Sequence, residues 1–170
     1  MEKAAALMVI EVTVISAEGL LVNRKQPGKE KTFVVVRSDP FHSRSTGMDP
    51  NGGSYPEWKE KLVMELPLHA RFVTVEVHSG SKIVGTANIP VSDFAGGFLP
   101  ENYLSFLSYR LRDANGEKNG IVNLSVKVKE AAGRGGAAAG CSGRTWAGVP
   151  VDGNVSDHGI AMVIPVSYRY

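Results

Sequence analysis

Hydrophobic and polar residues alternate along most of the first 130 residues of this chain. Apolar side chains occupy every second position from Met8 to Val14 and again from Val122 to Val128. A period of two is typical of β-strands with one buried face, whereas an amphipathic helix repeats every 3.6 residues. The pattern predicts eight strands, over residues 8–14, 32–37, 42–46, 58–66, 73–77, 83–89, 104–111 and 121–128.

Turn-forming residues separate these expected strands. The segment from Asp49 to Gly53 reads Asp-Pro-Asn-Gly-Gly and predicts a turn, and Asn115-Gly116 is a strong signal for a β-hairpin. A short helical turn is expected after Ser92, with Ser92 or Asp93 as its cap. Many short strands at this spacing predict an all-β sandwich or barrel.

The composition changes near residue 131. Residues 131–140 are almost entirely alanine and glycine, which is typical of a flexible linker. We therefore expect a domain over residues 7–130 and a flexible linker with a C-terminal tail over 131–170. The tail ends in the proline-interrupted apolar segment Ile164–Tyr170, which suits strand addition to its own domain or to a partner, with simple disorder as the alternative.

Several segments of the domain resemble the C2 domain family. Residues 9–21 resemble its first strand and turn, and Tyr55–Glu60 resembles its Asn-Pro-x-Trp-Asn-Glu segment. Val75–Val77, Val84-Gly85 and Ile89–Val91 follow in the family's order. The resemblance implies an eight-stranded antiparallel β-sandwich, in either of two strand connectivities. The chain is most similar in type to small plant C2 proteins, including a copine-associated group, which implies membrane-associated roles in stress, defence and cell-death control, and a copine as a protein partner.

Composition and charge limit the classes of partner and the cellular compartment that we expect. The net charge is only +2, so a nucleic-acid partner is not expected. Cys141 is the only cysteine, which excludes an internal disulfide and fits the cytoplasm. No apolar stretch approaches the roughly 18 residues of a membrane span. We expect a cytoplasmic protein held peripherally at the inner face of the plasma membrane.

Calcium-dependent C2 domains gather carboxylates on loops at one end, because calcium prefers oxygen ligands. By the C2 resemblance, Lys31 occupies the position of one calcium-binding aspartate of the family. The segment from His78 to Lys82 occupies the positions of further calcium-binding aspartates. Glu30 is the one carboxylate that remains nearby. We therefore predict no calcium site, no other metal and no cofactor. The histidines lack metal-binding spacing and are expected at surface or loop positions.

Basic residues replace the acidic ones at this end. The predicted lipid-binding residues are Arg24, Lys25, Lys29, Lys31 and Lys82. Fixed cations attract an anionic leaflet directly, and such docking weakens with salt. A protein contact and a merely solvated loop are the alternatives. A possible second basic face comprises Arg37, His42, Arg44, Lys59 and Lys61, with an ordinary solvated face as its alternative. Leu20 and Trp58 are expected to pack in the core or at its rim, and insertion into a bilayer is the alternative for the segment Leu20–Val22.

The chain carries no recognisable catalytic motif. It has no Gly-x-Ser-x-Gly nucleophile segment and no phosphate-cradling glycine loop. We therefore expect a non-enzyme without a small-molecule substrate. The leading hypothesis is a calcium-independent C2 adaptor that docks on anionic phospholipid membrane, on a protein such as a copine, or on both. The alternative is a protein-interaction module with no affinity for lipid.

Overall fold

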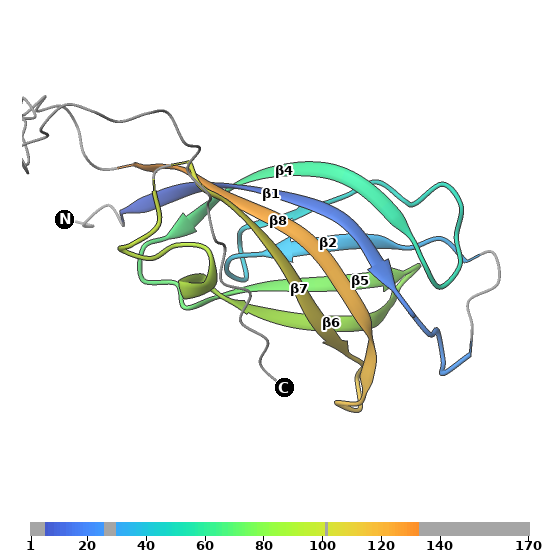
Figure 1. Cartoon of the computed structure of the whole chain (residues 1–170). Helices are drawn as coiled ribbons and strands as arrows, with labels where there is room; N and C mark the ends of the chain where they lie inside the picture. The colour runs from blue at the N-terminus through green and yellow to red at the C-terminus, as the bar shows by residue number, and fades with distance from the viewer. Residues whose placement is uncertain (1–5, 26–29, 101, 133–170) are drawn as a thin grey trace, which may run out of the picture. The chain divides into compact units, whose positions relative to one another are not determined.

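The computed structural model of the protein describes residues 6–25, 30–100 and 102–132 (Figure 1). The strands are β1 (Leu7–Glu18), β2 (Phe33–Arg37), β3 (Ser43–Ser45), β4 (Glu57–Pro67), β5 (Phe72–Ser79), β6 (Lys82–Pro90), β7 (Leu104–Arg112) and β8 (Lys118–Ala132). All eight expected strands are present, and every pairing between them is antiparallel. The all-β prediction is confirmed. The expected strand addition by the C-terminal tail lies outside the described residues.

The strands form two four-stranded layers. One layer has the order β3-β2-β5-β6 and the other has the order β7-β8-β1-β4. The layers are connected at a single register pair, Thr86 with Arg112, between β6 and β7. Figure 1 shows β4, β1, β8 and β7 side by side in one layer, with β2, β5 and β6 in the other. The first strand lies between β8 and β4 and pairs with both.

The core fills the space between the two layers. Alternate residues of β1 and β8 are buried, as the period of two predicts, because successive side chains of a strand point to opposite faces. The largest fully buried side chains include Ile10, Val12, Val14, Leu20, Val34, Val36, Leu66, Val75, Val77, Ile89, Leu111 and Leu124. Leu20 is therefore a core residue. Trp58 packs partly buried against the core, and its Nε1–H donates to the carbonyl of Thr32 over 2.9 Å.

Local structure differs from expectation in a few places. β1 continues to Glu18 through a bulge between Val14 and Ser16, and β8 ends at Ala132. The helical turn is a 3₁₀ turn over Val91–Asp93 that begins after Pro90 and has no side-chain cap, so the expected cap by Ser92 or Asp93 is wrong. The reason is that the turn begins earlier than expected, with Pro90 at the cap position, so Ser92 and Asp93 lie inside the turn.

The hairpin between β7 and β8 forms where Asn115-Gly116 predicts it. The N–H of Gly116 donates to the carbonyl of Asp113, and the N–H of Asp113 donates to the carbonyl of Glu117, each over 2.9 Å. Gly116 has a φ of 79°, a left-handed conformation that glycine adopts without a steric penalty. The hairpin lies at the same end of the sandwich as the loop that follows β1 (Figure 1).

Candidate functional site

Three segments that are distant in sequence line a cleft at this end of the sandwich. They are the loop after β1 (residues 21–24), the start of β6 (82–84) and the β7–β8 hairpin (113–119, without Gly116). The cleft has a volume of about 590 Å³. Its walls combine apolar side chains such as Leu21 and Ile83 with the cations Arg24, Lys82 and Lys118. We call this hollow the tip cleft.

Asn119 holds the walls of the tip cleft together. Its Oδ1 accepts a hydrogen bond from the N–H of Leu21, and its Nδ2 donates to the carbonyls of Leu21 and Val84, all over 2.8 Å. The residue is 6% exposed. One side chain therefore fixes the β1 loop and β6 at the root of the β7–β8 hairpin. The sequence pattern did not indicate this role of Asn119, whose one signal is a polar residue before Gly120 at the start of an otherwise alternating strand.

Arg24 lies at the apex of a tight turn in the β1 loop. Val22 and Lys25 exchange backbone hydrogen bonds of 2.9 and 3.0 Å across the turn. Asn23 and Arg24 between them have φ values of 51° and 61°, the positive values of a type I′ turn. Asparagine tolerates this region, but arginine adopts it rarely. The turn therefore holds the Arg24 backbone in a strained conformation beside the tip cleft.

The charges in the tip cleft are partly compensated. The Arg24 guanidinium forms an ion pair with the Glu117 carboxylate of the hairpin. This hydrogen bond, together with the charges of Glu117 and Asp113, raises the pKa of Arg24 above its usual value. Lys82 donates from Nζ to the Oδ1 of Asn23. The cleft thus contains three cations and two carboxylates.

The structure brings together some of the predicted lipid-binding residues. Arg24 and Lys82 both line the tip cleft, Lys25 is exposed beside Arg24, and Lys31 is exposed just before β2. Lys29 lies outside the described residues. Lys118 joins the cleft although the sequence analysis did not select it, because the hairpin that carries it gave no sign of approaching the β1 loop.

The acidic residues near the loops are engaged within the protein. Glu30 is exposed, and its Oε2 accepts a hydrogen bond from the Ser79 hydroxyl over 3.4 Å. Asp49 is buried, and its carboxylate accepts hydrogen bonds from the N–H groups of Thr32 (2.7 Å) and Gly52 (2.6 Å). Asp49 therefore holds the loop between β3 and β4. Across the residues that the structure describes, no group of three or more histidine, cysteine, aspartate or glutamate side chains could bind a metal.

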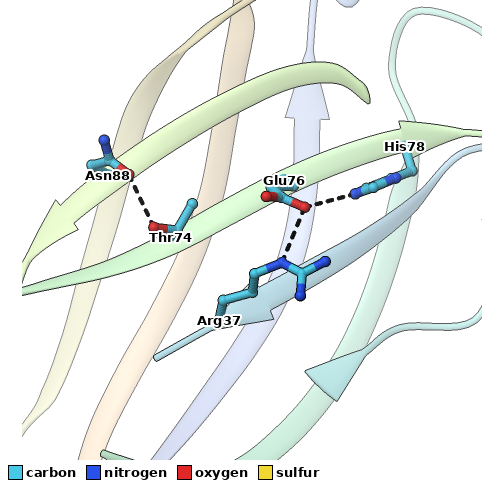
Figure 2. Close-up of polar contacts among 5 residues, drawn as sticks. All are labelled: Arg37, Thr74, Glu76, His78 and Asn88. Carbon is cyan, nitrogen blue, oxygen red and sulfur yellow. Dashed lines mark hydrogen bonds and ion pairs between the residues drawn. The ribbon is translucent and has the colours of Figure 1, made fainter. Parts of the chain in front are cut away.

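A polar cluster lies on the outer face of β2, β5 and β6 (Figure 2). Arg37 and His78 both contact Glu76, with distances of 3.3 Å and 2.9 Å to its Oε2. His78 stacks on Phe33 with a ring separation of 5.1 Å, and its side chain is 14% exposed. His78 thus lies in β5 and not in a loop, on the outer face of the sheet, where it is partly covered between an aromatic ring and a carboxylate.

The remaining residues of the predicted second basic face are spread over both layers. His42 contacts Asp39 at 2.7 Å, and this hydrogen bond lowers the pKa of the Asp39 carboxyl. The further contacts are Arg44 Nε to the Val63 carbonyl (3.3 Å), Lys59 to Glu57 (2.8 Å) and Lys61 to Glu11 (2.8 Å). Four of the five predicted residues thus have a carboxylate partner. The structure does not bring the five together into one uncompensated basic surface.

Comparison with known proteins gives one family and one fold. The C2 domain family model matches residues 8–106. BON1-associated protein 2 of Arabidopsis thaliana is 55% identical over 128 residues, which cover 71% of this chain and 61% of the relative. The chain therefore matches less than two thirds of that relative's length.

Solved structures with low sequence identity share the fold. A C2 domain-containing protein from a putative elicitor-responsive gene has a TM-score of 0.58 and 17% identity, covering 81% of this chain and 99% of that one. A C2 domain of plant Extended Synaptotagmin 1 has a TM-score of 0.54 and 15% identity, covering 72% of this chain and 94% of that one. Within the described part of the chain, no helix has the length and hydropathy needed to cross a bilayer.

Proposed function

Because this chain belongs to the C2 domain family, we propose that it is a calcium-independent adaptor that docks on anionic phospholipid membrane through the tip cleft and its rim. One observation carries the proposal: Arg24, Lys82 and Lys118 come from three separate segments and converge at one end of a rigid sandwich. Clustered cations attract the negative surface of a cytoplasmic leaflet without a bridging metal.

Apolar side chains at the same end support a membrane contact. Leu21 and Ile83 are 36% and 47% exposed, and both line the tip cleft beside the cations. An apolar group among cations suits the boundary between lipid headgroups and acyl chains, where burial of its surface adds to the electrostatic attraction. The docking is therefore peripheral and salt-sensitive, at the inner face of the plasma membrane.

A protein partner is the second part of the proposal. The name of the Arabidopsis relative describes association with a protein called BON1, and the two chains are 55% identical over the matched region. We extend partner binding to this chain, with a copine as the partner that the family resemblance implies. The adaptor itself performs no catalysis and works in stress, defence or cell-death control by bringing that partner to the membrane.

Vesicle sedimentation in the presence of a calcium chelator tests the lipid part. We expect the wild-type protein to pellet with anionic vesicles at low salt and to be released as salt rises. Lys82→Glu should weaken binding strongly. Arg71→Glu makes the same change of charge at an exposed position before β5, at the opposite end of the strand from the tip cleft, and should leave binding nearly unchanged.

Two outcomes would contradict the proposal. Absence of pelleting at low salt would leave a protein-interaction module with no lipid affinity. Micromolar calcium binding by titration calorimetry would overturn the calcium-independent mechanism.

A further inference from the structure

We infer that Glu117 is an internal competitor at the tip cleft, and that a lipid headgroup carrying a phosphate monoester displaces it from Arg24. The inference rests on the proposed membrane docking and adds the class of headgroup and a mechanism that limits its affinity. It starts from the one ion pair that connects the β1 loop to the β7–β8 hairpin in the described part of the chain.

The cations of the tip cleft suit a phosphate group. Arg24 offers a planar fork of N–H donors, which matches two oxygens of a phosphate, while Lys82 and Lys118 supply compact charges. Lys82 has three donors and gives one of them to Asn23. A phosphate monoester carries more negative charge than the diester of an ordinary phospholipid, so three converging cations favour the monoester.

The carboxylate of Glu117 occupies the position that such a phosphate would take on Arg24. Its side chain is 56% exposed, so it can turn toward solvent when a stronger anion arrives. Its backbone stays in place, because the N–H of Glu117 donates to the Oδ1 of Asp113 over 3.0 Å. The same Oδ1 accepts from the N–H of Asn115 over 2.9 Å, so the Asp113 carboxylate serves the turn and does not compete in the same way.

The backbone that carries Arg24 is held in place for this exchange. The positive φ values at Asn23 and Arg24 fix the turn, and the Asn119 side chain fixes the loop that carries it. A loop backbone that is already ordered loses little conformational entropy when the headgroup binds. Backbone strain of this kind is found more often at functional sites than elsewhere.

The size of the tip cleft indicates a headgroup larger than a bare phosphate. Its volume of about 590 Å³ falls within the range of about 300–1,000 Å³ that is usual for small-ligand sites. The two exposed apolar side chains at its wall, Leu21 and Ile83, keep the site at the membrane surface. The tip cleft therefore has room for a headgroup larger than the phosphate group that Arg24 would bind.

The experiment compares two kinds of vesicle in chelator: phosphatidylcholine with phosphatidylinositol 4-phosphate, and phosphatidylcholine with phosphatidylglycerol at the same total charge. Glu117→Gln should bind the first kind about two- to fivefold more tightly than wild type, since a neutral amide releases Arg24. Glu65→Gln removes the same charge from an exposed position at the far end of β4 and should change nothing. In an Arg24→Gln background, Glu117→Gln should give no further gain.

The outcomes separate this inference from the proposed function. If wild type binds neither vesicle, the membrane function itself fails. If wild type binds but Glu117→Gln is no tighter than Glu65→Gln, docking stands and the competitor is refuted. An equal gain on phosphatidylglycerol vesicles would refute the preference for a phosphate monoester. A thermal melt of Glu117→Gln at the wild-type temperature confirms that the variant is folded.

Discussion

Replacement of Asn119 by alanine tests whether one amide holds the tip cleft together. The change removes the acceptor for the N–H of Leu21 and the donors to the carbonyls of Leu21 and Val84. Alanine fits the space and keeps the backbone of β8 intact. The variant therefore isolates the hydrogen bonds from the fold that surrounds them.

The expected loss of stability follows from the count of these bonds. A hydrogen bond between a side chain and the backbone contributes about 1 kcal/mol net, and more where the abandoned partner is buried. The bond to Val84 is buried, whereas Leu21 lies at the exposed edge of the tip cleft and can turn to water. We expect the free energy of unfolding to fall by about 2–3 kcal/mol. For a domain of this size, that lowers Tm by roughly 8–12 °C.

Urea unfolding followed by far-ultraviolet circular dichroism measures the change. Asn123→Ala is the matched control on the same strand, because among the described residues the Asn123 amide bonds only to the side chains of Ser16, Glu18 and Ser108, at a partly exposed surface. The control should lose at most about 0.5 kcal/mol. Equal values for the two variants would refute the role of Asn119 as a clamp. The Asn119 variant should also bind vesicles more weakly, because its β1 loop is no longer fixed.

Three further changes test other parts of the structure. Gly120→Ala should destabilise the domain by more than about 1 kcal/mol in the same urea assay, since φ is +78° and a Cβ would meet a backbone oxygen at 2.6 Å. The pKa of Glu11 is lowered by hydrogen bonds, first from Lys61 and then from Lys129. The ionised carboxylate therefore stabilises the fold above its ordinary pKa of 4.5, and this contribution is lost as the pH falls. In Glu11→Gln, the free energy of unfolding should depend less on pH in this range. Trp58→Phe should cost about 1 kcal/mol by thermal melting through its lost indole hydrogen bond.

The alternation of apolar residues was sufficient to predict strands with one buried face, such as β1 and β8. A strand with one buried face needs a period of two, and the buried residues of β1 and β8 follow it closely. The hairpin at Asn115-Gly116 was predictable for a similar reason, because the turn depends on its own residues. Such features are local, and the sequence displays them directly.

The tip cleft depends on contacts between distant segments, and these were harder to predict. Asn119 contacts Leu21 across 98 positions of the sequence. Lys118 reaches the cleft only because the hairpin returns to the β1 loop, so the pattern near it gave no indication. The predicted second basic face does not form one uncompensated surface, for a related reason. Carboxylates on neighbouring strands, such as Glu11 and Glu76, form ion pairs with its basic residues, and the order of charges along the sequence does not show these pairs.

The position of β1 between β8 and β4 constrains how the protein is made. On the ribosome, β1 emerges first, and its partner β8 emerges roughly a hundred residues later. Until then Ile10, Val12 and Val14 lack the strand that completes their layer, and closing so long a loop slows folding. A nascent chain that stops before Lys118 therefore leaves one edge of β1 unpaired, and such an edge can pair with a strand of another chain.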